Sequence, residues 1–269
     1  MSILNTIVER KKEELFEQKK RLSPTELEQS PFFNRKTFSL SQALRNANPG
    51  IIAEFKRKSP SKGIINDQAD VAETTQGYVQ AGAAALSVLT DVDFFAGSDG
   101  NLCVARAQNQ VPILRKDFTI DEYQITEAKA LGADAILLIA AILPLPRILV
   151  LAQQAHQLGL EVLLEVHTET ELQQTALNEL IAPFIDVVGV NNRDLKTFET
   201  SIETSIRLAK LMPENLVKIS ESGINDPANI RALMKHGYQG FLIGEHFMKQ
   251  PNPAQACGDF IQAIKTAIG

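Results

Sequence analysis

The chain has 269 residues, and its content of 44% hydrophobic and 22% charged residues is that of an ordinary soluble globular protein. A formal net charge of −5 argues against nucleic acid or an anionic membrane as the main partner, and the longest apolar run, 135–143, is too short to span a bilayer. Two cysteines without metal or redox spacing, and a first segment without a signal-peptide core, predict reduced thiols in a cytoplasmic protein.

Residues 1–48 predict a helical extension. Apolar side chains recur at a helical period among glutamates and lysines, at Ile3, Leu4, Ile7, Val8, Leu15 and Phe16. Two Ser-Pro pairs, at 23–24 and 30–31, then interrupt this pattern. We therefore expect residues 1–48 to pack as helices on a main domain formed by residues 49–269. A solvated charged arm is the alternative.

Short runs rich in β-forming residues follow at regular intervals from residue 50 onward. The eight runs are Ile51–Phe55, Ala85–Thr90, Pro112–Phe118, Ala135–Ala140, Glu161–Val166, Val187–Asn191, Val217–Glu221 and Gly240–Gly244. Segments with helical spacing, such as 120–131 and 147–158, lie between them. Strands that alternate with helices indicate parallel strands joined by crossover helices.

Four glycines mark a repeated unit. Each follows a helical stretch and precedes a strand, as expected of a residue that ends a helix, at Gly82, Gly132, Gly159 and Gly237. Their separations of 50, 27 and 78 residues are close to two, one and three units of about 26 residues. Eight such units favour an α/β fold of the (βα)8 TIM-barrel type over a doubly wound open sheet, which has fewer strands. Neither of the two Gly-rich loops that bind nucleotides in open sheets is present in the sequence.

Charged residues cluster at the carboxyl ends of the predicted strands, where barrels build their active sites. Because side chains alternate along a strand, an apolar set points into the barrel, namely Ile52, Leu114, Leu163, Ile219 and Leu242. A polar ring lies above this set, at Glu54, Lys56, Lys116, Glu165, Asn191 and Glu221. Buried charges are costly unless they are paired, so the ring favours catalysis. An ion-pair network that only ties the barrel top together is the alternative.

The last two predicted strands end in Ser222-Gly223 and Gly244-Glu245. Glycine lets backbone N–H groups approach an anion, and a helix N-terminus adds positive charge. TIM barrels hold phosphate at this place, so we expect a phosphate site here. Ordinary turn glycines are the alternative.

The loop after the first predicted strand, residues 56–63, carries four cations within seven residues, at Lys56, Arg57, Lys58 and Lys62. Such a run is commonly a solvated face and less often a nucleic-acid patch. Because this one follows an inward Glu and Lys and contains Gly and two serines, we expect a mobile lid over an anionic substrate. No pair of the four histidines has zinc spacing, and we expect no metal site.

Seven motifs, in order along the chain, resemble the indole-3-glycerol phosphate synthase family. They are Ile52–Lys56 with Ser59–Gly63, Ser87–Asp91 with Phe95–Ser98, Ile113–Phe118, Leu164–Glu165, Val190–Leu195, Glu221–Ile224 and Phe241–Gly244. The resemblance runs from the N-terminal helix to the last strand, and the chain stops soon after it, as in the monofunctional form. The chain departs from the family at Glu245, where some members have a small hydroxyl residue.

This resemblance implies an enzyme of tryptophan biosynthesis, a carboxy-lyase that needs no cofactor or metal. The substrate would be 1-(2-carboxyphenylamino)-1-deoxyribulose 5-phosphate, and the products would be indole-3-glycerol phosphate, carbon dioxide and water. Lys116 would protonate the sugar carbonyl while the aryl carbon attacks it, and Glu165 with Lys56 or Lys116 would serve the dehydration. Lys56 would also pair with the aryl carboxylate.

The remaining site residues follow from the same resemblance. The lysines and the sugar hydroxyls would be held by Glu54, Asn191 and Glu221. The aryl ring would lie against Phe95 and Phe118, with Arg193 on the anionic side. Substrate binding, chiefly at the phosphate, would fall to Ser59, Ser222, Gly223, Leu242, Gly244 and Glu245.

Other functions stay open. A sugar-phosphate isomerase similar to phosphoribosylanthranilate isomerase needs a catalytic cysteine at the end of the first strand, where this chain has Glu54. A Schiff-base aldolase needs a lysine at a strand end, which Lys116 would supply. A non-catalytic scaffold would need no charged ring over its core. The sequence does not say whether other tryptophan-pathway enzymes bind the chain.

Overall fold

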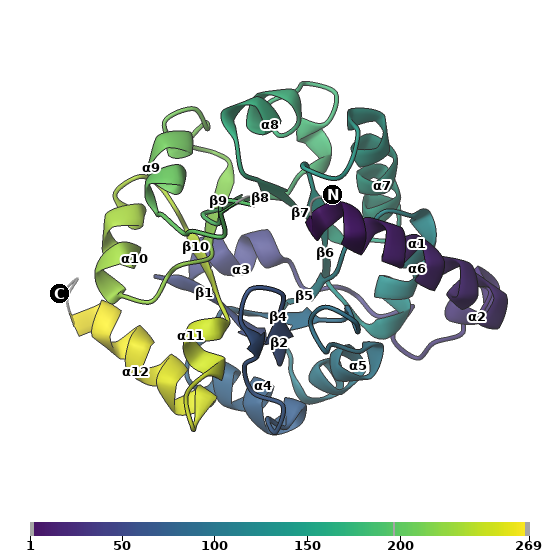
Figure 1. Ribbon diagram of the computed structural model, residues 1–269, viewed down its shortest axis with the longest axis horizontal. Coiled ribbons are helices and arrows are strands. Elements are labelled where there is room, and N and C mark those ends of the chain that lie inside the picture. The colour runs from purple at the N-terminus through teal and green to yellow at the C-terminus, as the bar shows by residue number, and fades with distance from the viewer. Residues whose placement is uncertain (1–2, 196, 267–269) are drawn as a thin grey trace.

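Parallel strands close into an eight-stranded barrel in the computed structural model, which describes residues 3–195 and 197–266. In chain order the strands are β1 (Gly50–Phe55), β4 (Ala85–Leu89), β5 (Ile113–Lys116), β6 (Ala135–Ile139), β7 (Glu161–Val166), β8 (Val187–Asn191), β9 (Val217–Glu221) and β10 (Gly240–Ile243). β1 pairs with both β4 and β10, so the barrel has no open edge (Figure 1). The predicted TIM barrel is confirmed, and each strand begins and ends within two residues of its predicted bounds.

Helices alternate with these strands and surround the barrel (Figure 1). They are α4 (Val71–Gln80), α5 (Asp99–Gln108), α6 (Glu122–Leu131), α7 (Leu145–Gln157), α8 (Glu169–Gln174), α9 (Glu203–Ala209), α10 (Pro227–Met234), α11 (Glu245–Met248) and α12 (Pro253–Thr266), with a 3-10 turn at Ala182–Phe184. Gly132 ends α6 with a φ of 92°, a left-handed conformation that favours glycine, and the other three predicted helix-ending glycines also have positive φ. None of the described helices has both the length and the apolarity that a membrane span requires.

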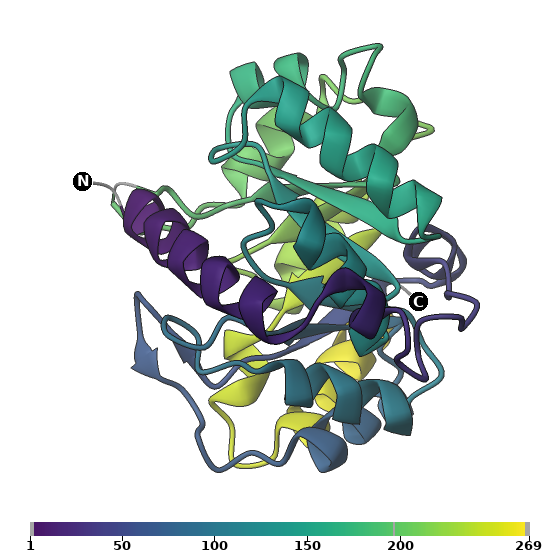
Figure 2. The same cartoon turned by 90° about the vertical axis from the view of Figure 1, so that its right-hand side faces the viewer.

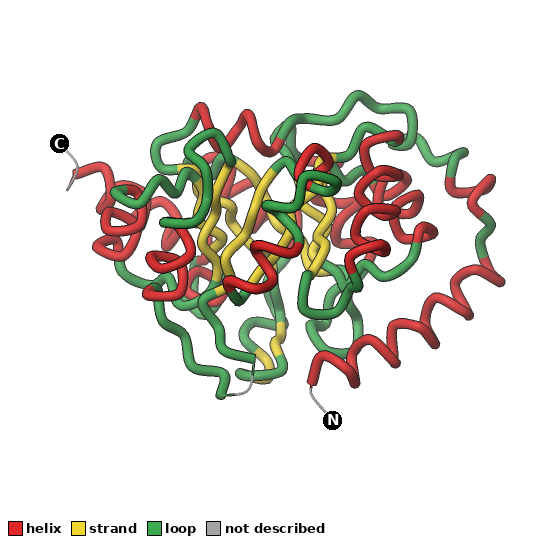
Figure 3. The backbone as a smooth tube through the Cα atoms, turned by 90° about the horizontal axis from the view of Figure 1, so that it is seen from above, coloured by secondary structure: helices red, strands yellow, loops and turns green. Residues whose placement is uncertain are grey.

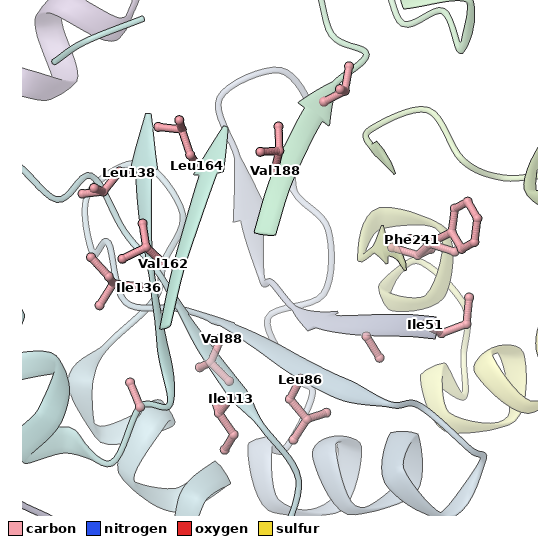
Figure 4. Packing of buried hydrophobic residues seen from close by; sticks show 14 of the residues in the cluster. Ile51, Leu86, Val88, Ile113, Ile136, Leu138, Val162, Leu164, Val188 and Phe241 are labelled. Carbon is pink, nitrogen blue, oxygen red and sulfur yellow. The ribbon is translucent and has the colours of Figure 1, made fainter. Parts of the chain in front are cut away.

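Two apolar layers stabilise the barrel. Figure 4 shows the outer one, in which strand side chains face the helices, among them Ile51, Leu86, Val88, Ile113, Ile136, Leu138, Val162, Leu164, Val188 and Phe241. The inner layer contains all five residues that strand alternation predicts to point inward, Ile52, Leu114, Leu163, Ile219 and Leu242. The two layers therefore confirm the predicted phase of the strands, which also sets where their terminal charges lie.

The N-terminal segment contacts both ends of the barrel. It forms α1 (Ile3–Arg21), α2 (Pro24–Leu27) and α3 (Leu40–Asn46). α3 closes the amino end, where Leu40 and Leu44 join the inner apolar layer. α1 runs obliquely across the barrel (Figure 2), and its Lys11 is buried against Asp91 and Asp117. The division of the chain at residue 48 stays a prediction.

A short antiparallel hairpin, β2 (Lys58–Ser59) with β3 (Gly63–Ile64), follows β1. The hairpin and the first turn of α1 lie at the same end of the barrel (Figure 3). This is the end at which the strands finish, and both segments line the pocket described next.

Candidate active site

A pocket of about 460 Å³ opens at the carboxyl ends of the strands. All fifteen residues that the sequence predicts for the site line it, namely Glu54, Lys56, Ser59, Phe95, Lys116, Phe118, Glu165, Asn191, Arg193, Glu221, Ser222, Gly223, Leu242, Gly244 and Glu245. Residues of α1 line it too, at Ile3, Leu4 and Ile7. Sequence reasoning missed these three as site residues. Their helical period predicts that one face of the helix is buried, but it does not predict which segment that face packs against.

Lys116 is the central charge of the pocket. Its Nζ lies 2.6 Å from Glu221 Oε2 and 3.1 Å from Glu165 Oε2, so β5 is linked to β9 and β7 across the barrel. Burial opposes the charge on this side chain, but the carboxylates of Glu221, Glu165 and Glu54 outweigh burial and raise the pKa of Lys116. Lys116 is therefore a cation in the free protein.

The two carboxylates that contact Lys116 differ in their protonation. Burial raises the pKa of Glu221 to about 7, although Lys116 opposes this effect. For Glu165, the charges of Lys116 and His167 outweigh burial and hold the pKa below its ordinary value. The pocket thus contains one carboxyl group that titrates near neutral pH and one that stays ionised.

Gly189 on β8 makes room for one of these carboxylates. A Cβ atom at this position would overlap Oε1 of Glu221, so no larger residue fits here without moving that side chain. Gly189 is a further residue that sequence reasoning missed. The sequence signal for Gly189 is a glycine within a strand, which commonly marks a place where another group approaches the backbone closely.

A second ion pair lies beside β1. Lys56 Nζ is 2.6 Å from Glu54 Oε1, and Ser87 donates a longer hydrogen bond to the same carboxylate. A Cβ atom at Gly244 would come within 2.5 Å of Glu54 Oε1. A branched side chain at Gly244 would therefore displace Glu54 as well as enter the space predicted for the phosphate.

Two aromatic rings form an apolar wall of the pocket. The centroids of Phe95 and Phe118 are 6.0 Å apart with the rings tilted by 41°, and both side chains line the pocket. Opposite charges and an apolar wall in one cavity suit a substrate that combines an aromatic ring with anionic groups.

The ends of β9 and β10 have the backbone shape expected of an anion site. Ser222 and Gly223 both have positive φ, 69° and 72°, and Gly244 begins α11 without a side-chain cap. N–H groups in a first helical turn have no partner within the helix. Asn192, which sequence reasoning missed, donates a hydrogen bond to the carbonyl oxygen of Ser222 and so fixes this turn.

Ser59 and Glu245 border the same end of the pocket. The Ser59 hydroxyl is buried and has no hydrogen-bond partner among the described residues, which suits a hydroxyl that binds substrate. The Glu245 carboxylate lies 3.9 Å from Lys62 and 4.0 Å from Arg193. A carboxylate repels phosphate, so only the backbone N–H of Glu245 suits the predicted contact.

The basic loop does not present its four cations together. Lys56 and Lys62 line the pocket. Arg57 instead lies over the ring of Phe55 and donates to the carbonyl oxygen of Ala69, and Lys58 donates to that of Asp93. The interpretation of the whole basic run as a cover over an anion is therefore wrong for Arg57 and Lys58, and the mobility of the loop stays a prediction.

His167 lies beside a catalytic candidate, whereas His246 lines the pocket itself. Nε2 of His167 is 3.5 Å from Glu165 Oε1. The sequence signal was available, since residues 165 and 167 share one side of an extended chain. No group of three or more His, Cys, Asp or Glu residues within the described ranges could hold a metal ion.

The closed parallel barrel, with a charged pocket at the carboxyl ends of its strands, defines a TIM-barrel enzyme. Residues 4–260 match the family model described as Indole-3-glycerol phosphate synthase. The chain therefore belongs to the indole-3-glycerol phosphate synthase family.

Curated relatives agree with this assignment. A protein named indole-3-glycerol phosphate synthase from Bacteroides thetaiotaomicron is 48% identical over 263 residues, which cover 98% of this chain and 99% of the relative. One of the same name from Acinetobacter baylyi is 46% identical over 256 residues, with 95% and 94% covered. The solved structure of KGPDC from Streptococcus mutans shares only the fold, with a TM-score of 0.61, 16% identity and coverage of 83% and 100%.

Proposed function

We propose that the chain converts 1-(2-carboxyphenylamino)-1-deoxyribulose 5-phosphate into indole-3-glycerol phosphate, carbon dioxide and water, a step of tryptophan biosynthesis. The observation that carries this proposal is Lys116, a partly buried cation between two carboxylates in a pocket with an aromatic wall and an expected anion site. The reaction needs a positioned acid, a base, a cation for the substrate carboxylate and a phosphate site, and the pocket offers candidates for each.

Ring closure uses the acid and the aromatic wall. Lys116 donates a proton to the carbonyl oxygen of the sugar while the aryl carbon that bears the carboxylate attacks the carbonyl carbon. Lys56 pairs with that carboxylate, and Phe95 and Phe118 flank the ring. The nitrogen becomes an iminium cation, and the carbonyl becomes a hydroxyl.

Loss of carbon dioxide and of water completes the indole. The bond to the carboxylate breaks, and its electron pair restores the aromatic ring and neutralises the iminium nitrogen. The new hydroxyl then leaves as water with a proton from Lys56, which the departing carboxylate has freed, while Glu165 removes a proton from the five-membered ring. Two protons are donated and one is removed, so each turnover takes up one proton.

The phosphate is held away from the reacting carbons. Ser59, the turn at Ser222 and Gly223, and the first N–H groups of α11 after Gly244 donate hydrogen bonds to it. Arg193 and Lys62 add positive charge at this end. Because these groups contact the phosphate equally in the ground state and the transition state, they serve mainly to hold the substrate.

Rival chemistries fit the pocket less well. A Schiff-base enzyme needs a neutral lysine, whereas neighbouring carboxylates raise the pKa of Lys116. An isomerase with a catalytic cysteine lacks its nucleophile here, because Cys103 and Cys257 lie in α5 and α12. Both thiols are free, and we expect the enzyme to act on its small anionic substrate in the cytoplasm.

An assay of indole fluorescence tests the proposal directly. We expect turnover with the carboxyphenylamino substrate, and we expect Lys116→Ala to lose roughly 10²–10⁴-fold in kcat, the usual share of a positioned acid. Glu165→Gln should also lose kcat while substrate affinity stays within about a few-fold. Lys36→Ala, at an exposed lysine outside the pocket, is the control. Full turnover by a folded Lys116→Ala variant would remove this lysine from the mechanism.

Activity should not depend on a metal ion. No group of ligating side chains in the described part of the chain has the arrangement that a metal needs, and the proposed steps use side-chain acids and bases as their catalysts. The measurement is turnover after exhaustive chelation. A loss of activity that one divalent ion restores would contradict this prediction.

A further inference from the structure

His167 lies between two carboxylates behind the pocket. It follows β7 directly, and its ring is buried. Nε2 is 3.5 Å from Oε1 of Glu165, and Nδ1 is 3.7 Å from Oε2 of Glu171. The ring does not line the pocket, so it reaches substrate only through Glu165.

The surroundings of His167 favour a charged ring. Neither ring nitrogen has a hydrogen-bond partner within the described residues, although both are buried. Burial disfavours the imidazolium form, but the carboxylates of Glu171 and Glu165 outweigh burial and raise the pKa of His167. A neutral ring would take a positive charge away from both carboxylates and leave Glu165 with Lys116 as its cationic partner.

Glu171 is fixed in place by the start of α8. Its carboxylate accepts a hydrogen bond of 2.7 Å from the backbone N–H of His167, and its own N–H donates to the hydroxyl of Thr168, the N-cap of the helix. A capping role explains this backbone bond, but it does not explain why the imidazole is placed against Glu165. The position of the imidazole against Glu165 therefore needs a separate explanation.

The proposed reaction supplies that explanation. Glu165 has two cationic neighbours, Lys116 and His167, and Lys116 gives up its proton during ring closure. Glu165 would then lose its main counter-charge just before it must accept a proton. The charge of His167 does not take part in ring closure and stays beside Glu165 throughout.

We propose that protonated His167, held by Glu171, is a positioning residue that keeps Glu165 ionised after Lys116 has donated its proton. This inference rests on the proposed role of Glu165 as the base. Glu221 on β9 and Glu54 on β1 are further ionisable groups near these residues, and both add negative charge. Negative neighbours favour a protonated Glu165, so the cation at His167 works against them.

The experiment compares His167→Gln and Glu171→Gln with the parent enzyme. Glutamine at 171 can still accept the backbone hydrogen bond, so this variant removes charge and keeps the cap. The matched control is His156→Gln, because His156 also pairs with a carboxylate, at 2.8 Å from Asp186, but lies outside the pocket. Circular dichroism and thermal melting verify the fold of each variant.

Two measurements report on Glu165 itself. One is the dependence of kcat on pH, whose acidic limb reports protonation of the base in the substrate complex. The other is an infrared titration of protonated carboxyl groups in the free enzyme, in which Glu165→Gln identifies the band of Glu165. A cation lost at this distance shifts a carboxyl pKa upward by roughly 1 unit or more.

We expect both measurements to shift upward in His167→Gln, to shift in the same direction in Glu171→Gln, and to stay unchanged in His156→Gln. Unchanged titration of Glu165 in a folded His167→Gln or Glu171→Gln variant would overturn the inference while leaving the proposed function intact. Full kcat in Glu165→Gln would instead overturn the role of Glu165 in the proposed function. If His167→Gln does not fold, Glu171→Gln decides the question alone.

Discussion

At the scale of single residues, the pocket divides groups near the reacting carbons from groups at the phosphate end. Lys116 contacts both Glu165 and Glu221 at the top of the barrel. Ser59 lies in the hairpin after β1 and contributes a buried hydroxyl without a partner among the described residues. Gly244 lies between the reacting end and the phosphate end of the pocket. A side chain at this position would overlap Glu54. Substitutions at Ser59 and Gly244 should therefore have different kinetic effects.

Ser59→Ala should raise KM and leave kcat within about a few-fold. A hydrogen bond to a charged group contributes roughly 1.5–3 kcal/mol, which corresponds to an increase in KM of about 10–100-fold. Gly244→Val should instead lower kcat, because it moves Glu54 and with it Lys56. Steady-state kinetics and inhibition by inorganic phosphate measure both effects. An unchanged KM in Ser59→Ala would mean that this hydroxyl does not bind the phosphate.

At the scale of elements, α1 acts as part of the pocket wall as well as an extension. Its first turns line the pocket, and Lys11 anchors it by contacts of 3.1 Å to Asp91 and 3.0 Å to Asp117. Burial opposes the charge on Lys11, but these carboxylates outweigh burial and raise its pKa. Lys11 is thus the buried member of the ion pairs that hold the helix, beside the more exposed pairs Arg10–Asp93 and Lys19–Asp121.

Lys11→Met should loosen α1 and raise KM. The variant leaves buried carboxylates without their lysine, and breaking a buried pair costs roughly 3–5 kcal/mol. Hydrogen exchange across residues 3–21 measures the loosening, and steady-state kinetics measure KM. Lys12→Met is the matched control, because Lys12 is exposed and, among the described residues, forms an ion pair only with Glu9 one turn away. Equal protection of α1 in the two variants would show that the buried lysine does not anchor the helix.

At the scale of the whole molecule, the barrel is closed by its first and last units. β1 pairs with β10, and α12 packs on α4 outside that seam. Two helical glycines lie in this contact. A Cβ atom at Gly77 would overlap that of Ala254, whereas one at Gly258 would meet Ala81 at an ordinary 3.6 Å. The seam is therefore packed tightly at one point and loosely at another.

Gly77→Ala should lower the free energy of unfolding by roughly 1–3 kcal/mol through overpacking. Gly258→Ala should raise it by roughly 0.5–1 kcal/mol, because alanine restricts the unfolded chain and fits the space. Equilibrium denaturation in urea measures both variants. Equal changes in the two would contradict the idea that the seam at Gly77 admits no side chain.

Much of the fold and the membership of the pocket could be predicted from the sequence. Alternation along a strand fixes which side each residue faces, so the sequence predicts that Leu114 and Lys116 point into the barrel, as the structure has them. Regular βα units predict eight strands, strand ends predict the polar ring, and the family resemblance adds the other candidates; all fifteen line one pocket. These features depend on local periodicity, which the chain carries in every segment.

Only the tertiary structure decided which of these residues meet. Lys116 contacts Glu221, 105 residues further along the chain, and this contact depends on how the strands are staggered when the barrel closes. The same closure turns Gly244 toward Glu54, directs Arg57 away from the pocket and lays α1 across its mouth. Periodicity determines the side of a strand on which a residue lies, whereas its partners depend on register and packing between distant segments, which no local pattern contains.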